Sequence, residues 1–431
     1  MKRLMMIILA AMMLLPAAVF ADDTNTKTEV STELVATAED LSKECEYNGP
    51  RGLNVKYALK DNDYDTATTL YKNDSITISW NENVPVSSVL VEFYRTPGSY
   101  TIIQYDANGK KLSGRKGIDG LINEIEYVSV ETRSVKIVCS GNNELVVCGL
   151  KAYGEGEIQG RHKWMPTPKK LDYLVVAMHP DDDVIFLGAI MPIYTGELGY
   201  VGSSLVMATN NRTRKDEYLN GEWVLGQRTA PLCGGFPDIG TQANAKPNSS
   251  FREDRVVPYL VRVIRQYKPE VVFSQDLNGE YGHWQHRRLA LWTKMAVPLA
   301  ADPSYDPESA EKFGTWEVKK HYIHLYEENA IKIDVTSPLN AFGGSSAFEV
   351  ATEAFKCHKT QNNGHHWVKN EGVYSMSDFG LTYTTVGPDT KGLNDPFEHT
   401  GIISKNEIRW RIEECAIQIF TGIRMITRDS K

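Results

Sequence analysis

The sequence predicts a two-domain chain in which an antiparallel β-sandwich precedes an α/β domain with a mostly parallel sheet. Short β-rich runs separated by turn residues dominate residues 41–154. Apolar runs alternate with helical patterns over residues 171–400, and a Gly- and Pro-containing stretch at 155–170 separates the two regions. The composition agrees with this prediction, because 431 residues with 42% hydrophobic side chains can build two or three cores.

The first 21 residues predict a cleaved export signal. Lys2 and Arg3 precede an apolar run at 4–15, and Val19 and Ala21 are the small residues that suit signal peptidase. This run is too short to span a bilayer, and no later run of roughly 18 apolar residues occurs. We therefore expect a secreted or periplasmic bacterial protein that is cleaved after Ala21 and keeps no stable membrane anchor. An uncleaved signal anchor is the weaker alternative.

Residues 22–40, rich in Thr, Asp, Glu and Lys, are expected to be poorly ordered, and the sandwich follows at 41–154. Its predicted strands include 75–80, 88–93, 100–103 and 135–138, with turns at 106–109 and 141–143. The chain has six cysteines, three of them before residue 150. In an exported protein they can form disulfides or stay buried as free thiols, and the sequence assigns no pairing.

The second domain shows the pattern of alternating strands and helices. Apolar strands are predicted at 174–177, 204–207 and 271–273, and an amphipathic helix at 255–267 ends before Lys268-Pro269. Ligands of such sheets lie beyond the carboxyl ends of the strands, so the residues after each strand are the first candidates for a site. Residues 401–431 form a C-terminal tail without a predicted role.

The charge of the chain argues against nucleic acid as a partner. The formal net charge is −8, from 55 acidic and 47 basic residues, and no clustered basic segment occurs.

One imidazole and three carboxylates occur together directly after the strand that ends near Met178, in the run His-Pro-Asp-Asp-Asp at 179–183. Crowded carboxylates repel one another, and a bound cation is the simplest way to remove that repulsion. An acidic loop that caps the helix starting near Val184 is the alternative.

A pair of histidines, His283 and His286, follows the strand at 271–273. Together His179, Asp182 and His286 make a set of two imidazoles and one carboxylate that leaves a fourth position for water, as expected of a catalytic zinc. A surface histidine pair without a metal is the alternative.

These two motifs, Met-His-Pro-Asp-Asp-Asp at 178–183 and Tyr-Gly-His-x-x-His at 281–286, resemble the signatures of the LmbE/PIG-L family of zinc-dependent de-N-acetylases. A third segment agrees, since Arg214 and Glu217 are similar to the family's Arg-x-x-Glu. Weaker likenesses occur at Pro237-Asp238 and at 354–361, which is similar to a late family helix. The resemblance covers about 171–400 and implies a Rossmann-like fold.

The resemblance also implies roles for individual residues. One zinc ion per chain is held by His179, Asp182 and His286, and Asp181 is the general base that takes a proton from the attacking water. Tyr281 or His283 stabilises the oxyanion or protonates the departing amine, and the sequence does not decide between them. Arg214 lies in the substrate pocket, and Asp238 joins it as a substrate-binding candidate.

Three positions depart from the family pattern: Trp284-Gln285 stands where many members have Pro-Asp, and Asp183 occupies a position that is often Glu. Trp284 is either a sugar-stacking platform or a core aromatic residue. Gln285 puts in doubt a carboxylate that would support the metal-binding histidines.

Other histidines carry weaker signals. His358 is either a supporting partner of the site or a helix residue without a role, and the pairs 321/324 and 365/366 fit a metal by spacing alone. Asp61 to Asp65 do not form an EF-hand, because Thr66 and Lys72 stand where Gly and Glu are needed. The segment 59–67 resembles the opening of galactose-binding-like, discoidin-type sandwiches, which bind glycans or brace a catalytic domain.

We therefore expect a secreted zinc hydrolase that removes acetyl groups from N-acetylated amino sugars, in N-acetylglucosamine or N-acetylgalactosamine glycans or glycoconjugates. The alternatives are a metal-dependent amidase for another sugar conjugate or a non-sugar amide, and an inactive glycan-binding protein. The sequence does not indicate an oligomeric state.

Overall fold

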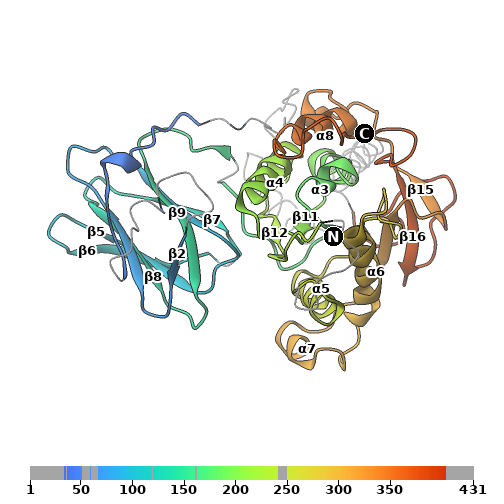
Figure 1. The fold of residues 1–431 in the computed structure, drawn as a ribbon, viewed down its shortest axis with the longest axis horizontal. Helices are drawn as coiled ribbons and strands as arrows, with labels where there is room; N and C mark the ends of the chain where they lie inside the picture. The colour runs from blue at the N-terminus through green and yellow to red at the C-terminus, as the bar shows by residue number, and fades with distance from the viewer. Residues whose placement is uncertain are drawn as a thin grey trace, which may run out of the picture.

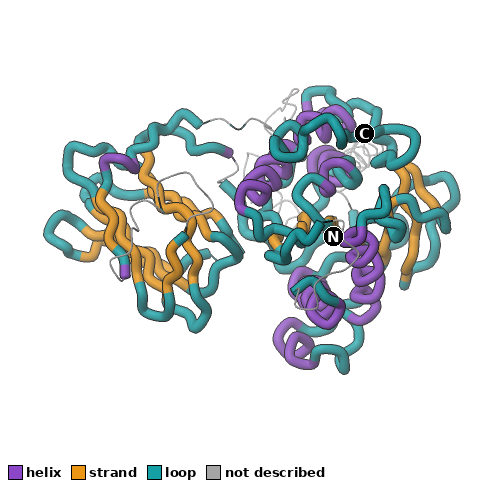
Figure 2. The backbone as a smooth tube through the Cα atoms, in the orientation of Figure 1, coloured by secondary structure: helices purple, strands orange, loops and turns teal. Residues whose placement is uncertain are grey.

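The computed structural model describes residues 34, 36–50, 59, 67–118, 120–160, 163–240 and 250–403. An antiparallel β-sandwich is followed by an α/β domain, which confirms the predicted fold class (Figure 1). Figure 2 shows the same division, with strands dominating the first domain and helices surrounding the sheet of the second. The expected signal at 1–21, residues 22–33, the acidic motif at 61–65, Cys415 and residues 404–431 lie outside the described residues.

Two antiparallel sheets form the sandwich, with strand orders β1-β3-β8-β5-β6 and β2-β9-β4-β7. Side chains alternate between buried and partly exposed along β3 and β8, the period of a strand with one face on a core. Ile76, Ile78, Val135 and Ile137 supply part of that core. The elements are η2 (Ser42–Glu44), β1 (Glu46–Asn48), β2 (Thr68–Leu70), β3 (Ser75–Ser79), β4 (Ser88–Phe93), β5 (Tyr100–Tyr105), β6 (Lys111–Lys116), β7 (Asn123–Tyr127), β8 (Ser134–Cys139) and β9 (Leu145–Tyr153).

Residues 36–40 differ from the expectation of poor order for 22–40. The backbone N–H groups of Thr37 and Ala38 donate to the carbonyl oxygen of Glu157 at 2.8 and 3.0 Å, and Asp40 pairs with Tyr153 in an antiparallel bridge. The chain that leaves β9 thus folds back on this segment and fixes it.

The five described cysteines, Cys45, Cys139, Cys148, Cys233 and Cys357, are free thiols. The three in the sandwich are buried, as the free-thiol alternative predicts. Burial raises the pKa of the Cys148 thiol to about 11, which keeps it protonated and unreactive at neutral pH.

The sheet of the second domain has the strand order β12-β11-β10-β13-β14-β16-β15. Its first five strands are parallel, and β16 pairs antiparallel with both β14 and β15. The chain adds strands on one side of β10 and then crosses to β13 on the other side, which makes the edge between β10 and β13 a topological switch point. The strands are β10 (Tyr173–Ala177), β11 (Gly202–Val206), β12 (Leu232–Cys233), β13 (Val271–Ser274), β14 (Lys320–His324), β15 (Ala330–Lys332) and β16 (Asp378–Thr384).

Helices cover both faces of this sheet, which explains why its strands are apolar without alternation. On β10, Val175 packs into the core that contains α3, α4 and α8, whereas Leu174 and Val176 pack into the core of α5 and α6. The helical elements are α3 (Asp182–Ile185), η5 (Met191–Glu197), α4 (Arg212–Val224), α5 (Glu253–Tyr267), α6 (Trp284–Leu299), α7 (Pro307–Phe313), η6 (Asn340–Phe342) and α8 (Ala347–Phe355).

Three element boundaries differ from the predictions. Strand β11 ends at Val206 rather than at Met207, although the N–H groups of Met207 and Ala208 still donate to the carbonyl oxygens of Ala177 and Met178. Helix α3 begins at Asp182, two residues before the predicted start. Helix α8 ends at Phe355, so 356–361 form turns instead of the predicted late helix, because Glu217 on α4 accepts the N–H of Thr360 at 2.8 Å.

The two domains contact each other through α4. The Lys215 ammonium group is buried and donates to the carbonyl oxygens of Phe93 and Tyr94 at 3.0 and 2.7 Å. The Tyr94 hydroxyl donates to the carbonyl oxygen of Asn210, and the Arg212 guanidinium lies 4.6 Å from the centre of the Tyr94 ring. The sandwich therefore braces the helix whose first turn also carries Arg214.

None of the helices in the described part of the chain is long and apolar enough to cross a membrane.

Candidate active site

The loop after β10 carries four buried charged or polar side chains, His179, Asp181, Asp182 and Asp183. Asp181 precedes α3 and has φ 127° and ψ −35°, a region that residues other than glycine rarely occupy. Its carbonyl oxygen accepts the N–H groups of Val184 and Ile185 and so begins the helix. Strained backbone of this kind is typical of functional sites, and here it falls on the predicted general base.

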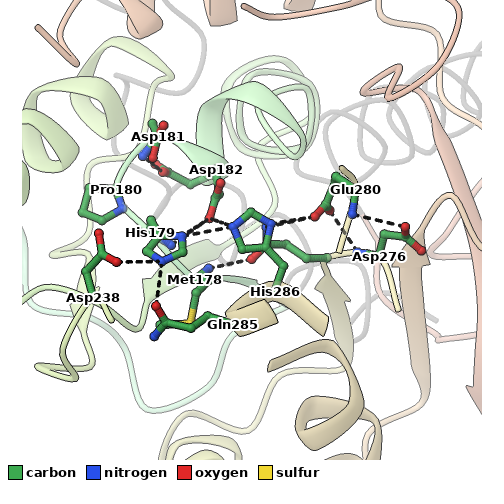
Figure 3. Close-up of polar contacts among 12 residues, drawn as sticks. Met178, His179, Pro180, Asp181, Asp182, Asp238, Asp276, Glu280, Gln285 and His286 are labelled. Atoms are coloured by element: carbon green, nitrogen blue, oxygen red, sulfur yellow. Dashed lines mark hydrogen bonds and ion pairs between the residues drawn. The ribbon is translucent and has the colours of Figure 1, made fainter. Parts of the chain in front are cut away.

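The structure brings together the three predicted metal ligands (Figure 3). Asp182 Oδ2 lies 3.0 Å from His179 Nδ1 and 3.0 Å from His286 Nε2, and the two ring nitrogens are 3.0 Å apart. His179 and Asp182 come from the end of β10, whereas His286 comes from the first turn of α6 after β13. The switch point of the sheet therefore explains why residues 107 positions apart meet.

The surroundings of His286 favour positive charge at this point. Burial alone would lower its pKa, but Asp182 on one side and Glu280 on the other raise it to about 10. Burial likewise opposes ionisation of Asp182, yet His286 and His179 hold its pKa well below its usual value. Three converging donor atoms in a place that favours a cation fit a divalent metal. His283 is an alternative to Asp182 as the third ligand, because donor atoms of His179, His283 and His286 lie within 4.8 Å of one another.

Glu280 supports His286 from the side opposite Asp182. Its fully buried carboxylate lies 2.8 Å from His286 Nδ1 and 3.3 Å from His324 Nδ1, and it accepts the N–H of Asp276 at 3.0 Å. Such a carboxylate fixes which ring nitrogen can face a metal. Sequence reasoning missed Glu280, although its position directly after β13, six residues before His286, was a usable signal.

Gln285 has a different role from the carboxylate that many family members carry there. Its Oε1 lies 3.3 Å from His179 Nε2 and accepts the N–H of Ile239 at 2.9 Å. The doubt that Gln285 raises about a supporting carboxylate does not apply to His286, because Glu280 supplies one.

Arg214 connects the predicted base to the mouth of the site. Its Nη2 donates to Asp181 Oδ1 and to the Pro180 carbonyl oxygen, both at 2.7 Å, and its Nη1 donates to Asp238 Oδ2 at 2.8 Å. Burial and the adjacent Asp182 raise the pKa of Asp181 well above its usual value, and Arg214 opposes that rise. Asp238 is partly exposed, and its Oδ1 lies 3.6 Å from His179 Nε2.

The buried side chain of Asp183 holds the backbone of Asp181 in place. Asp183 Oδ1 accepts the Asp181 N–H at 2.9 Å. Its carboxyl group contacts that of Glu222 on α4, and burial raises the pKa of Asp183 to about 6 and that of Glu222 well above its usual value. Asp183 Oδ2 and Glu222 Oε2 have no other hydrogen-bond partner among the described residues, so a proton shared between the two carboxyl groups would give each a partner.

Tyr281 and His283 lie on the open side of the histidines. The His283 ring is 4.8 Å from that of His179 and 4.4 Å from that of His286, and its Nδ1 has no hydrogen-bond partner among the described residues. Burial and the two neighbouring histidines lower the pKa of His283 to about 4, so its ring is neutral at pH 7. Tyr281 is 46% exposed, and burial and Asp182 raise the pKa of its hydroxyl, which therefore stays protonated.

Trp284 lies away from the three ligands. Its ring is 6.1 Å from that of Phe251 and 5.9 Å from the Arg288 guanidinium, and it packs against the core of α5 and α6. This placement favours the core alternative, while a role in substrate binding stays a prediction.

Three further histidines of the described residues, His321, His324 and His358, are buried in the α/β domain. His321 bonds to Ser274 Oγ at 2.8 Å, and His324 Nε2 lies 2.9 Å from the carbonyl oxygen of Ser375, so this pair does not face a common ion. His358 is buried beside α4 with neither ring nitrogen bonded within the described residues, and burial lowers its pKa to about 3. A Cβ atom at Gly221 would lie 2.8 Å from His358 Nε2, so only glycine permits this packing.

Several proteins of known function and solved structures are similar to this chain, among them two sugar deacetylases. A 1D-myo-inositol 2-acetamido-2-deoxy-alpha-D-glucopyranoside deacetylase 1 of Catenulispora acidiphila is 32% identical over 209 residues, covering 42% of this chain and 63% of the relative. The deacetylase 2 of the same name from Frankia alni is 34% identical over 289 residues, covering 52% of this chain and 95% of the relative.

An N,N'-diacetylchitobiose deacetylase from Pyrococcus horikoshii aligns with TM-score 0.36 and 17% identity, over 46% of this chain and 72% of that one. The lectin domain of lectinolysin aligns with TM-score 0.23 and 12% identity, over 28% of this chain and 99% of that domain. A comparison with models of protein families gives no match.

The assignment rests on the sequence relatives, because the Frankia alni protein is aligned over nearly its whole length at more than 30% identity. The chain therefore belongs to the LmbE/PIG-L family and is homologous to metal-dependent N-acetylglucosaminyl deacetylases.

Proposed function

We propose that this protein is a zinc-dependent hydrolase that removes the acetyl group from N-acetylated amino sugars in glycans or glycoconjugates. The observation that carries the proposal is the 3.0 Å triangle of His179 Nδ1, Asp182 Oδ2 and His286 Nε2 beside the strained Asp181. The relatives act, by their names, on an acetamido sugar.

His179, Asp182 and His286 would hold one zinc ion per chain. When bound, zinc supplies a Lewis acid that polarises an amide carbonyl and makes water more acidic. Glu280 and Gln285 hold the two imidazoles so that one nitrogen of each ring faces this point. Cysteine ligands, which are typical of structural zinc sites, are absent from this cluster.

Asp181 serves as the base in this proposal. Its raised pKa brings its proton affinity closer to that needed for general base catalysis near neutral pH. It takes one proton from the attacking water, whose oxygen bonds to the amide carbon. Arg214 holds the carboxylate from one side, and the hydrogen bond from the Asp181 N–H to Asp183 fixes the backbone.

The open side of the site supports the rest of the reaction. A neutral His283 and a protonated Tyr281 can each donate a hydrogen bond to the oxyanion that forms on the carbonyl. The C–N bond then breaks, the amine leaves with a proton from Tyr281 or His283, which regains one from the proton that Asp181 took from water, and acetate and the free amino sugar are released. The choice between Tyr281 and His283 as the donor of that proton stays open.

Three side chains are candidates for substrate binding, and two of them lie at the mouth of the site. Arg214 and Asp238 are bonded to each other there, and Trp284 is the third candidate from the sequence. A partly exposed carboxylate such as Asp238 is suited to accepting hydrogen bonds from sugar hydroxyl groups.

The β-sandwich is proposed to brace the catalytic domain, and a glycan-binding role is the alternative. The contacts of Lys215 and Tyr94 support bracing, since they join the sandwich to the helix that carries Arg214.

Export is the remaining part of the proposal. The charged and apolar segment at 1–21 supports it, and mass spectrometry of protein from the culture medium or periplasm should find a mature chain that starts at Asp22. A chain that retains residues 1–21 and stays with the membrane would support the uncleaved anchor instead.

The proposed reaction is tested by acetate release from a panel of N-acetylglucosamine and N-acetylgalactosamine oligosaccharides. Zinc-loaded protein should release acetate, chelation should stop it, and Asp181→Asn should lower kcat by about 10²- to 10⁴-fold while the zinc stays bound. If fully zinc-loaded protein releases no acetate from the panel, the deacetylase proposal fails. Binding without turnover would then favour the inactive glycan-binding alternative, and turnover of non-sugar amides alone would favour the amidase.

A further inference from the structure

A cavity of about 190 Å³ opens beside Tyr281, on the side away from the metal-binding candidates. Phe186 and Tyr281 form one wall, and the loop at 365–374 forms the other with His366, Trp367, Lys369 and Tyr374. The Tyr281 ring lines this cavity and is 5.6 Å from the ring of His286 and 5.7 Å from that of His366, so it borders both the catalytic centre and the cavity. The two spaces therefore share one aromatic residue.

The loop presents Trp367 to solvent in a defined position. Trp367 is 56% exposed, whereas the next residue, Val368, is only 7% exposed and packs into the core of α3, α4 and α8. Val368 thus anchors the loop, and the loop is held in place without burial of Trp367. The exposed indole of Trp367 offers a large apolar face and an N–H group to a ligand in the cavity.

Lys369 adds a polar group to this aromatic surface. Its ammonium nitrogen lies 5.0 Å from the centre of the Trp367 ring and 5.2 Å from that of Tyr374. It forms no ion pair with any residue in the described ranges. Its N–H donors consequently stay available at the edge of the cavity.

We propose that this cavity is a subsite for the sugar ring next to the acetylated residue of an oligosaccharide. The inference rests on the proposed deacetylase function. Aromatic faces pack against the C–H face of a pyranose, and Lys369 donates to a ring hydroxyl. The cavity is smaller than the roughly 300–1,000 Å³ of typical ligand pockets, which suits one ring rather than several. Because Tyr281 borders both the cavity and the catalytic centre, a sugar ring in the cavity would be the neighbour of the sugar whose acetyl group is removed.

The test compares kcat/KM for N-acetylglucosamine and N,N'-diacetylchitobiose in zinc-loaded wild type and variants. Trp367→Ala should lower the preference for the disaccharide roughly three- to tenfold, mainly through KM, and Trp367→Phe should restore most of it. Leu393→Ala is the matched control, because Leu393 is 57% exposed on the same domain but does not line the cavity. Equal effects of Trp367→Ala on both substrates, or no effect, would overturn the subsite while leaving the deacetylase proposal intact.

A second measurement separates the two proposals if no substrate is turned over. Calorimetric titration with diacetylchitobiose should then still show weaker binding to Trp367→Ala than to wild type and to Leu393→Ala. Equal binding by all three proteins, or no binding by any of them, would overturn the subsite.

Discussion

Oδ1 of Asp181 accepts a hydrogen bond from Nη2 of Arg214 at 2.7 Å, and this pair links the metal-binding loop to the helix that contacts the β-sandwich. Asp181 is buried, and its backbone has an unfavourable positive φ. Arg214 thus opposes the rise in the pKa of Asp181 that burial and the adjacent Asp182 cause. The activity of the base is therefore expected to depend on Arg214.

Replacing Arg214 should impair catalysis and change its pH dependence. Burial raises the pKa of Asp181 and Arg214 opposes this rise, so Arg214→Gln should raise the pKa further. A base acts when deprotonated, so the acidic limb of the kcat/KM profile should move to higher pH, with a loss of about 10²-fold at neutral pH. Arg252→Gln, an exposed arginine paired with Asp254, is the control. An unchanged profile would show that Arg214 does not act on the base.

Glu280 should control metal affinity rather than the chemical step. Glu280→Gln removes the charge that supports His286 Nδ1, and loss of such a partner typically costs about 10- to 100-fold in metal affinity. Competition with a coloured chelator measures this affinity, and excess zinc should restore most of the activity. Glu270→Gln, a buried carboxylate that pairs with Lys170 and Lys319, is the matched control. Unchanged affinity in Glu280→Gln would contradict the supporting role.

The carboxyl pair of Asp183 and Glu222 should make stability depend on pH. Burial raises the pKa of Asp183 to about 6 and that of Glu222 well above its usual value. The folded protein therefore binds more protons than the unfolded chain, and the contribution of the pair to stability is lost as pH rises from about 4 through 6 and beyond.

Glu222→Gln keeps a hydrogen-bond donor and removes one ionisable group from this pair. The Tm of the variant minus that of wild type should therefore be larger at pH 8 than at pH 5. All Tm values are measured at saturating zinc. A difference in Tm that does not change between pH 5 and pH 8 would exclude the shared proton.

Lys215 should couple the two domains. Lys215→Met removes two charge-assisted hydrogen bonds to the Phe93 and Tyr94 carbonyl oxygens and is expected to lower the free energy of unfolding by about 1–3 kcal/mol. Urea unfolding followed by tryptophan fluorescence measures this change, and limited proteolysis should cut more readily between the domains. Lys356→Met, on the exposed surface, should have no such effect. If Lys215→Met unfolds like wild type, the brace is not energetically important.

The fold and the convergence of the candidate ligands were predictable because they depend on local patterns. The apolar strands at 174–177 and 271–273 and the residues after them indicate a sheet with a site at its carboxyl edge, and the structure brings His179, Asp182 and His286 together there. The roles of Asp181, Tyr281, His283 and Asp238 came only from resemblance and stay predictions.

The rest depends on contacts between distant segments, which no local pattern encodes. Nothing in the run around Lys215 indicates two carbonyl oxygens from a strand 121 and 122 positions away. Glu222 likewise lies in an ordinary helical pattern, and only the packing of α4 against α3 brings it to Asp183. The turn at 356–361 replaces the expected helix for the same reason, since Glu217 binds Thr360 from another element.

The central claim is that His179, Asp182 and His286 hold one divalent ion, with His283 outside the ligand set. Metal analysis of purified variants tests it most directly. Asp182→Ala and His286→Ala should lose bound zinc, whereas His283→Ala should retain about one equivalent per chain, as wild type does. Full zinc occupancy in Asp182→Ala together with its loss in His283→Ala would contradict the claim and place the ion among the three histidines instead.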